Sequence, residues 1–504
     1  MTTGDLFLRA SSIGRFRGPI GVVGISLLLA GGAALGARWS PALFVAFVAA
    51  LGVVVGVSAV RWPRVAIVIV VLAPVLDRYV VADLLPDDLE TVAHYLSEGL
   101  LLLVGLILAA RAWRDGRLVG ALVHPITAAL LAFAALGIAS AVVNGVPPHI
   151  AAIGLVFTLD AAALFFLPRV VGFTPRQSLY AIAAIGTIVV VAAVLVIAQA
   201  LLSPRILGFE PIRGRFGEFG RLASLFGDPN VFGAFVVAII PFPVLMATRL
   251  PTPTQRRIAG AITFVLLLAL WLSFSRGAWI ALVLGVGTVL LIIDRRALLL
   301  GLLLCIFTFG VANYMPRDLL VPERGPRQPN LVDSTIDRVD TVRMGGDLRI
   351  LFAINAVPIL RDHPILGVGP GRYGGAVAHN FDTPIYERYD HDRLFWNPAQ
   401  RTVDNFWLHL LVEAGIVGFI AFLAAVLIPG LRILHAVRDA IGWRRILLTG
   451  AAAATAGMAV NSVTTMLLEA NSIGFLFWFM LALGSMMAAT TAGIGRPSDE
   501  TGAT

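Results

Sequence analysis

Residues 178–202 read SLYAIAAIGTIVVVAAVLVIAQALL, a run of 25 residues without a charged side chain. About 20 consecutive apolar residues suffice for a helix to cross the hydrocarbon core of a bilayer. Because lipid offers the backbone no hydrogen-bond partners, a single spanning segment satisfies its own polar groups by forming a helix. This stretch therefore predicts a transmembrane α-helix.

The rest of the chain repeats this pattern. Of its 504 residues, 58% are hydrophobic and 13% charged, whereas soluble domains carry about 25% charged residues. This composition excludes a soluble enzyme, a disordered chain and a nucleic-acid binder of the usual kind. Fourteen blocks have about the length and apolar character that a bilayer requires, at 18–37, 41–60, 64–82, 96–112, 120–143, 149–167, 178–202, 230–248, 257–273, 277–293, 297–313, 403–429, 445–466 and 471–493.

Two of these blocks are interrupted by charge. Asp77 and Arg78 fall in the third block and Asp160 in the sixth; without these two blocks, twelve spans are left. The predicted fold is an all-α polytopic integral membrane protein with about 14 (12–14) transmembrane helices, surrounded by membrane lipids.

The basic residues orient these spans. All 38 are Arg, and cytoplasmic loops carry the excess of basic residues in membrane proteins. With the N-terminus in the cytoplasm, 20 Arg lie inside and 7 outside, once the long segment 314–402 with its 11 Arg is set aside. The sequence therefore predicts that both termini are cytoplasmic.

The spans and loops divide the chain into five parts. These are transmembrane helices 1–7 (1–203), helices 8–11 with an Arg-bearing outer loop (204–313), a large extracytoplasmic loop (314–402), helices 12–14 (403–495) and a cytoplasmic tail (496–504). The large loop balances 11 Arg with 11 acidic residues and contains an apolar, helix-like stretch from Leu348 to Leu360. We expect it to form an ordered cap on the membrane surface.

Several Arg residues lie on the predicted outer side. Arg213, Arg215 and Arg221 belong to the loop 203–229, and Arg276 lies in the turn before the tenth span. An Arg near the hydrocarbon costs about 2.5–3.5 kcal/mol on insertion scales and is usually paired or functional. Each could reach to the interface like any long basic side chain. Several together favour an anion site, because guanidinium groups bind phosphate oxygens two at a time.

Four motifs carry a resemblance to a known family: GDPN (227–230), SRGAW (275–279), HPILGVGPGRY (363–373) and DNFWLHLLVEAGIVG (404–418). Together they resemble the O-antigen ligase and polymerase superfamily of the bacterial envelope. The family's last motif is His, then Asn, Ser or Gln, nine residues, Gly, two residues and Gly. Here the spacing from Asn405 to Gly415 and Gly418 is kept, and Asp404 replaces the His.

The resemblance implies an activity and a location. Members transfer a glycan from a polyprenyl diphosphate donor to a hydroxyl acceptor, on the outer face of the bacterial cytoplasmic membrane, without a metal or other cofactor. By position, Asp404, Arg276 and Arg349 form the catalytic set: Asp404 takes the place of the activating His, and the two Arg hold the leaving diphosphate. The implied substrate-binding residues are Arg215, Arg221, Arg372, Asn405, Asn230, Gly369 and Gly371.

Other readings of these residues stay open. Asp404 precedes a predicted helix, where Asp also serves as an N-cap. Glu413, within the same span, suits either a functional role or a structural hydrogen bond. His391 is a second candidate base, and we expect His409 to lie in the core. The GxGxxG pattern of residues 369–374 lacks the strand–helix–strand context of a dinucleotide site, so we expect a tight backbone turn near a ligand.

Function also has alternatives. Ligase and polymerase differ only in the acceptor, and the replacement of the motif His by Asp404 favours a polymerase or an atypical ligase. A transporter or flippase of envelope glycolipids is the alternative from another class. It would place charged residues along a path through the membrane, between inverted repeats, and the sequence shows neither pattern.

Overall fold

The computed structural model describes residues 41–84, 95–202, 212–213, 220–314, 348–381, 383–390, 402–469 and 471–494. Within them the chain is helical, apart from one antiparallel pairing of two-residue strands, β1 (Ile212–Arg213) and β2 (Gly220–Arg221). The expected all-α class is confirmed for this part of the chain. The expected span 18–37 and the tail 496–504 lie outside the described residues.

The N-terminal helices follow the expected spans closely. They are α3 (Pro41–Arg61), α4 (Pro63–Leu84), α6 (Leu96–Arg114), α7 (Leu118–Leu122), α8 (Pro125–Val143), α9 (Pro148–Leu159), α10 (Ala163–Val171) and α11 (Pro175–Leu201). A 3₁₀ turn, η3 (Asp160–Ala162), joins α9 to α10, and there the Asp160 carboxylate accepts a hydrogen bond from the Ala161 N–H. The charge that interrupts the expected sixth span therefore tightens one turn of the helix without ending it.

The central helices include one local irregularity. The elements are a 3₁₀ turn η5 (Ser224–Phe226), α12 (Pro229–Ile239), α13 (Pro241–Arg249), α14 (Pro253–Leu272), α15 (Arg276–Ile280), the π-helical turn η6 (Ala281–Val286), α16 (Gly287–Ile293) and α17 (Arg295–Tyr314). A Cβ on Gly285, in η6, would lie 2.6 Å from the Gly457 Cα. The π-helical turn thus lies where two backbones approach closely, and only a glycine fits at the contact.

The C-terminal third contains the described parts of the expected large loop. Its helices are α20 (Leu348–Asp362), α21 (Ala376–Asn380), α22 (Pro384–Arg388), α23 (Phe406–Val437), α24 (Gly442–Asn461) and α25 (Asn471–Ile494). The apolar stretch Leu348 to Leu360 is confirmed as a helix, α20, which packs against α23. Whether the loop caps a substrate cavity stays a prediction.

Proline marks the start of many helices. It is the first residue of α3, α4, α8, α9, α11, α12, α13, α14 and α22. The first turn of a helix leaves its N–H groups without helical partners, so proline, which has no N–H, costs nothing there. Side-chain caps complete some of these starts: Thr174 Oγ1 accepts from Gln177 N, and Asp228 Oδ1 accepts from Asn230 N. The short turns between spans are thus encoded locally.

Eight helical segments of the described chain are long and apolar enough to cross a membrane. They are Leu96–Arg114, Pro125–Val143, Pro148–Val171, Pro175–Leu201, Pro229–Arg249, Pro253–Leu272, Arg276–Ile293 and Phe406–Val437. Three shorter apolar stretches, at 45–61, 63–75 and 473–489, accompany them. The protein is therefore an apolar helical membrane protein, and the count of about fourteen spans stays a prediction.

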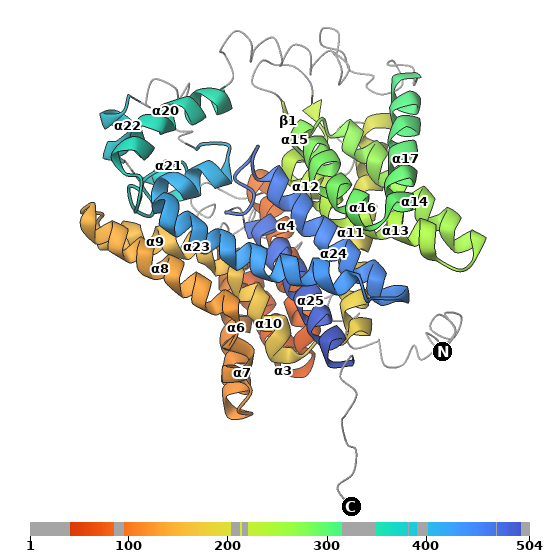
Figure 1. The fold of residues 1–504 in the computed structure, drawn as a ribbon, viewed down its shortest axis with the longest axis horizontal. Coiled ribbons are helices and arrows are strands. Elements are labelled where there is room, and N and C mark those ends of the chain that lie inside the picture. The colour runs from red at the N-terminus through yellow and green to blue at the C-terminus, as the bar shows by residue number, and fades with distance from the viewer. Residues whose placement is uncertain are drawn as a thin grey trace, which may run out of the picture.

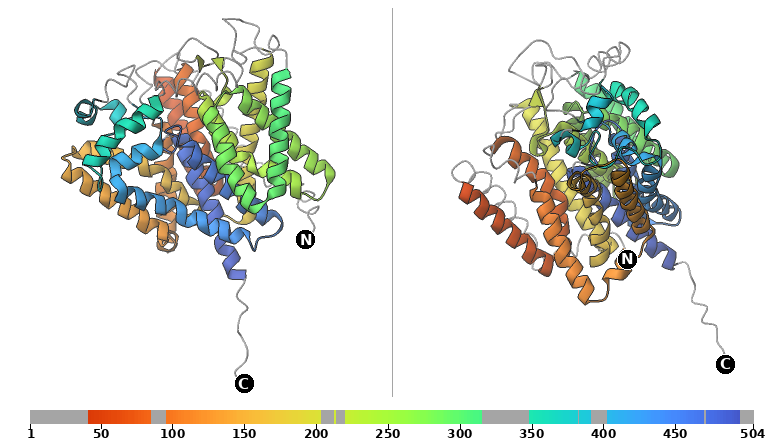
Figure 2. Two further views of the ribbon diagram at one scale, coloured as in Figure 1. Left: turned by 45° about the horizontal axis from the view of Figure 1, so that its top comes forward. Right: turned by 90° about the vertical axis from the view of Figure 1, so that its left-hand side faces the viewer.

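Three helices, α12, α13 and α25, lie at the centre of this assembly. The segment Pro229–Arg249, α12 with α13, is 89% buried over its most apolar window. Helix α25 packs against α4, α10, α23 and α24. Helices that are apolar all round belong in the interior of a large helical protein. Around them, α8 and α23 run side by side (Figure 1). Figure 2 shows the same helices from two further directions.

The ends of the helices separate two groups of Arg. Arg61 ends α3, Arg111 lies in the last turn of α6 and Arg117 precedes α7; all three line one cavity. Helices α3 and α7 lie in the lower part of Figure 1. Arg276 begins α15 and Arg349 lies in the first turn of α20, both in the upper part of the same view. These three Arg therefore lie at one end of the helices, and Arg276 and Arg349 at the other. Which end faces the cytoplasm stays a prediction.

Candidate functional site

The motifs GDPN and SRGAW meet in space. Asn230 is the second residue of α12, and its side-chain oxygen accepts a hydrogen bond from Ser275 Oγ at 3.3 Å. Ser275 directly precedes Arg276, the first residue of α15. A Cβ on Gly233 would lie 2.9 Å from Ser275 Oγ, so a side chain there would push the two helices apart. The fold thus holds Asn230 and Arg276 at neighbouring helix starts.

The turn after α24 links this pair to the last motif. A Cβ on Gly277 would lie 2.2 Å from Thr464 Oγ1, so the turn at 461–465 packs directly against SRGAW. The same turn accepts a hydrogen bond from the first residue of α23, Phe406 N to Ser462 O, at 2.9 Å. Three motifs that are far apart in sequence therefore share one neighbourhood.

Asp404 and Arg349 form an ion pair at the start of α23. Arg349 Nη2 donates to Asp404 Oδ2 at 3.3 Å, and the two side chains are 37% and 54% exposed. The structure thus brings together two residues of the predicted catalytic set. Exposed pairs of this kind contribute little to stability, about 0–1 kcal/mol. The pair therefore positions charge at an accessible edge more than it holds the fold together.

The N-cap of α23 is Asn405. Its side-chain oxygen accepts from Leu408 N at 3.0 Å, and its backbone has the extended conformation of a cap residue. The alternative reading of Asp404 as the helix cap is therefore wrong by one residue. The Asp404 carboxylate therefore does not cap the helix; it pairs with Arg349 and is exposed. The Asn405 side chain, expected to bind substrate, accepts the capping hydrogen bond instead.

Helix α23 is broken at Gly415. The backbone of this residue has φ 63° and ψ −176°, so the helix stops and restarts there. A break leaves carbonyl groups free on one side and N–H groups free on the other, and membrane proteins tolerate this only where the protein satisfies both. A Cβ on Gly415 would lie 2.3 Å from Ile365 O, so the conformation and the space both require glycine.

The glycine-rich stretch 363–375 satisfies the groups freed by this break. On one side Val368 N donates to Val412 O and Gly369 N to Glu413 O, both at 3.0 Å. On the other side Ile416 N donates to Pro364 O at 3.0 Å. The motif glycines of α23 and the glycine-rich stretch are thus two halves of one structure, and the expected tight turn is confirmed by the positive φ of Gly369 and Gly371.

Glu413 fastens the next part of the stretch to α23. Its two carboxylate oxygens accept from Gly371 N at 2.9 Å and Tyr373 N at 2.7 Å, and the side chain is 4% exposed. Of the two readings of Glu413, the structural hydrogen bond is present. Gly369 and Gly371 are expected to contact substrate. Gly369 has Val146, on the turn between α8 and α9, as a close neighbour, and Gly371 has Ile150, in the first turn of α9.

Arg372 reaches the same turn. Its Nη2 donates to Gly145 O at 3.1 Å, and burial lowers the pKa of the guanidinium, which stays charged at any relevant pH. The hydrogen bond described for the Arg372 side chain is with the turn between α8 and α9, whereas Arg276 and Arg349 lie by the starts of α12 and α23. The structure thus gives Arg372 a different set of neighbours from the two predicted catalytic Arg.

A buried His and a second carboxylate complete the region. His409, expected in the core, is 2% exposed; its Nδ1 hydrogen-bonds Tyr373 O, and its Nε2 lies 3.9 Å from Glu469 Oε2. Glu469 also accepts from Ala376 N at 2.9 Å. Sequence reasoning missed Glu469, although it is the one carboxylate between residues 440 and 498. A single carboxylate in so apolar a region indicates by itself a paired or functional residue.

Two buried tyrosines, Tyr373 within the glycine-rich stretch and Tyr386 after it, form hydrogen bonds with backbone groups. Tyr386 OH accepts from Gly374 N at 2.7 Å, and Tyr373 OH donates to Phe352 O at 3.4 Å. Burial raises the pKa of both phenols, so both stay protonated at neutral pH. With Phe352, Ile359 and other apolar side chains they form a small core separate from that of the membrane helices.

Three of the predicted residues have no described side chain. Arg215 and His391 lie outside the described residues; Arg221 belongs to β2, and its side chain is not described. Within the described chain, no three His, Cys, Asp or Glu side chains gather as a metal site requires.

Comparison with known proteins supports the resemblance. Residues 261–423 match the family model described as O-antigen ligase. The matched segment includes Arg276, Arg349 and Asp404, and it leaves out Asn230 and Glu469. No curated protein matches the chain. The resemblance to the O-antigen ligase superfamily is confirmed, and with the apolar helices it indicates a membrane protein of glycosyltransferase type.

Proposed function

We propose that the protein transfers a glycan from a polyprenyl diphosphate donor to a hydroxyl acceptor, on the outer face of the bacterial cytoplasmic membrane. The observation that carries this proposal is the Arg349–Asp404 ion pair, which lies at the accessible start of α23 within the matched segment. A carboxylate beside a guanidinium supplies a proton acceptor and a diphosphate-binding cation in one place.

The reaction is a single displacement. Asp404 takes the proton of the acceptor hydroxyl, and the oxygen attacks the anomeric carbon. The bond between that carbon and the phosphate oxygen breaks, and its electron pair leaves with the diphosphate, whose charge Arg276 and Arg349 stabilise. One displacement inverts the anomeric centre, so we expect the product to have the configuration opposite to that of the donor.

The carboxylate of Asp404 acts as a general base. It takes the proton of the acceptor hydroxyl while the oxygen attacks the anomeric carbon.

The experiment is reconstitution in liposomes. The purified protein receives a polyprenyl-diphosphate-linked glycan and, in separate reactions, a glycolipid acceptor or more of the same donor. Glycan on the glycolipid indicates a ligase, and lengthening of the donor's own glycan indicates a polymerase; either product with an inverted linkage supports the proposal. Retention of configuration overturns the single displacement, and no product with either acceptor overturns the function.

A further inference from the structure

A second polar site lies at the opposite end of the helices. A cavity of about 340 Å³ opens among the ends of α3, α6 and α10 and the starts of α4 and α7. Its lining, among the described residues, includes four Arg, six apolar residues and no carboxylate: Arg61, Arg64, Arg111 and Arg117, with Val60, Pro63, Leu108, Ala112, Val170 and Val171. The proposed transfer reaction does not use any of these residues.

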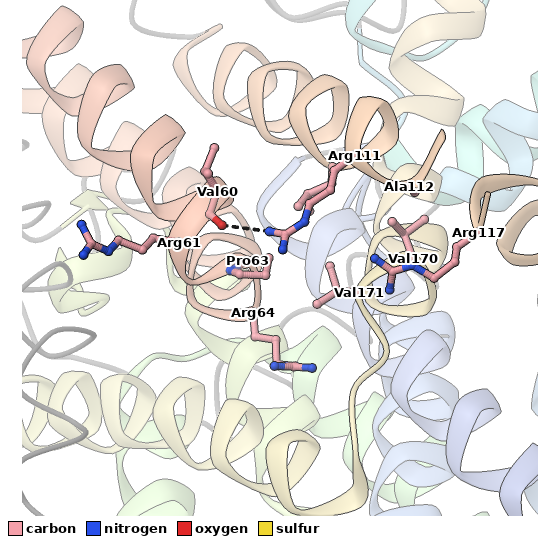
Figure 3. A pocket seen from close by; sticks show the side chains of 10 residues that line it. Val60, Arg61, Pro63, Arg64, Arg111, Ala112, Arg117, Val170 and Val171 are labelled. Atoms are coloured by element: carbon pink, nitrogen blue, oxygen red, sulfur yellow. Dashed lines mark hydrogen bonds between the residues drawn. The ribbon is translucent and has the colours of Figure 1, made fainter. Parts of the chain in front are cut away.

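Three of the guanidinium groups gather around Val171, while Arg61 points away from them (Figure 3). Arg111 Nη1 donates to Val60 O at 2.9 Å, and Arg64 Nη2 donates to Gly172 O at 3.1 Å. The guanidinium groups of Arg64 and Arg111 are thus each held by one backbone carbonyl. A guanidinium has five N–H donors, and Arg64 Nε has no hydrogen-bond partner among the described residues.

The described residues supply little negative charge to balance the Arg of this cavity. Arg117 pairs with Asp115, whereas the hydrogen bonds described for Arg64 and Arg111 go to neutral backbone carbonyls. Like charges held around one cavity repel each other, and an anion placed between them removes that cost. Guanidinium groups bind phosphate oxygens in pairs, with two parallel N–H donors.

The surroundings of the cavity suit a lipid. Helix α3 exposes Val53 and Val57, and α6 exposes Leu102 and Leu106, each within the last two or three turns before its Arg. These two helices pack together, so their apolar faces continue from the cavity toward the middle of the membrane. A volume of 340 Å³ equals that of roughly eleven water molecules at about 30 Å³ each. That is room for a phosphate group and the short polar chain attached to it.

We propose that this cavity binds the phosphodiester headgroup of an anionic membrane phospholipid, with the acyl chains along the exposed faces of α3 and α6. Basic pockets between membrane helices on the cytoplasmic side bind such headgroups. The Arg side chains here hold the phosphate and at the same time tie the helix ends together through Val60 O and Gly172 O. The site is independent of glycan transfer.

The test is lipid binding by the full-length protein, followed by native mass spectrometry after addition of phosphatidylglycerol or phosphatidylcholine. We expect the wild type to retain phosphatidylglycerol in preference. The triple variant Arg64→Gln, Arg111→Gln, Arg117→Gln is expected to bind it about a hundred-fold more weakly, since each basic residue near an anionic membrane contributes roughly a factor of five. Equal retention of the two lipids by the wild type overturns the proposal.

The matched control is Arg114→Gln, Arg257→Gln, Arg438→Gln, which removes the same charge from exposed residues outside the cavity. It should keep the wild-type affinity, and an equal loss in both triple variants would show attraction to surface charge only. Inorganic phosphate is the competitor: displacement of the lipid at millimolar phosphate would identify a soluble phosphate as the ligand and overturn the assignment to a lipid.

Folding is checked by thermal unfolding. Should the triple variant not fold, Arg117→Gln replaces it, because Arg117 pairs with Asp115 on the same loop and its described bonds include none to another helix. Arg117→Gln is expected to weaken phosphatidylglycerol binding about five-fold. Unchanged binding by this folded variant overturns the proposal.

Discussion

Arg349 Nη2 lies 3.3 Å from Asp404 Oδ2, which joins residues 55 positions apart in the chain. Arg349 belongs to the first turn of α20, and Asp404 precedes the cap of α23. Neither side chain is buried, so the pair is accessible to a substrate at the edge of the helices. Substitution of Arg349 or Asp404 can separate the contribution of the pair to stability from its contribution to glycan transfer.

Replacement of Arg349 separates stability from activity. Arg349→Gln should lower the free energy of unfolding by less than about 1 kcal/mol, because the pair is exposed. The same variant should lower kcat/KM for glycan transfer by about 10²–10³, because it removes a cation that stabilises the leaving diphosphate. Thermal unfolding and initial rates measure the two effects. A stable variant with wild-type kcat/KM would remove Arg349 from the site.

Asp404→His restores the residue that the family motif has at this position. We expect this variant to transfer glycan within about ten-fold of the wild type at pH 8, and Asp404→Asn to lose about 10²–10⁴ of the rate. Only neutral imidazole accepts a proton, and its reference pKa is about 6.5. The rate of Asp404→His should therefore rise with pH through that region. Should Asp404→His be as inactive as Asp404→Asn across the pH range, Asp404 does not act as a proton acceptor.

Gly415→Ala tests the break in α23. The residue has φ 63°, and the added Cβ would lie 2.3 Å from Ile365 O, so we expect a loss of at least about 1–3 kcal/mol in the free energy of unfolding. Gly430→Ala in the same helix is the control, since no heavy atom lies within 4 Å of its Cβ position. Alanine favours a helix there by about 1 kcal/mol. Equal melting temperatures for the two variants would contradict the described break.

Glu413→Gln tests the attachment of the glycine-rich stretch. Both carboxylate oxygens accept backbone N–H groups, and an amide has only one accepting oxygen. One buried N–H group then faces an NH₂ group, and we expect a destabilisation of about 1–3 kcal/mol. Glu387→Gln, at an exposed position of α22, is the control and should leave the melting temperature unchanged. An equally stable Glu413→Gln would show that these bonds do not hold the stretch.

The sequence predicts the membrane helices well, because the signal for a spanning helix is local. Twenty apolar residues, a proline at the start and a charged turn at the end are contained within one segment. The sequence predicts the position of the interruption at Asp160. It does not predict the consequence, which is a 3₁₀ turn within the continuous helical segment Pro148–Val171. The helix cap is a finer matter: Asp404 and Asn405 are both good caps, and their order in the sequence does not show which one the helix uses.

The break in α23 could not be predicted in the same way. The spacing of Gly415 and Gly418 is visible in the sequence, but the reason for a glycine at 415 lies about fifty residues earlier, in the stretch from Pro364 to Gly371. Neither segment shows by itself that it completes the hydrogen bonds of the other. The sequence did not predict a role for Glu469 for the same reason. Its partners, Ala376 N and His409, come from other segments of the chain.

The most direct test of the central claim is the initial rate of glycan transfer in liposomes by Asp404→Ala, compared with the wild type. Asp439→Ala, at an exposed carboxylate after α23, is the matched control. We predict that Asp404→Ala folds normally and loses about 10²–10⁴ of the rate, while Asp439→Ala keeps it. Transfer by Asp404→Ala at the wild-type rate would contradict the account.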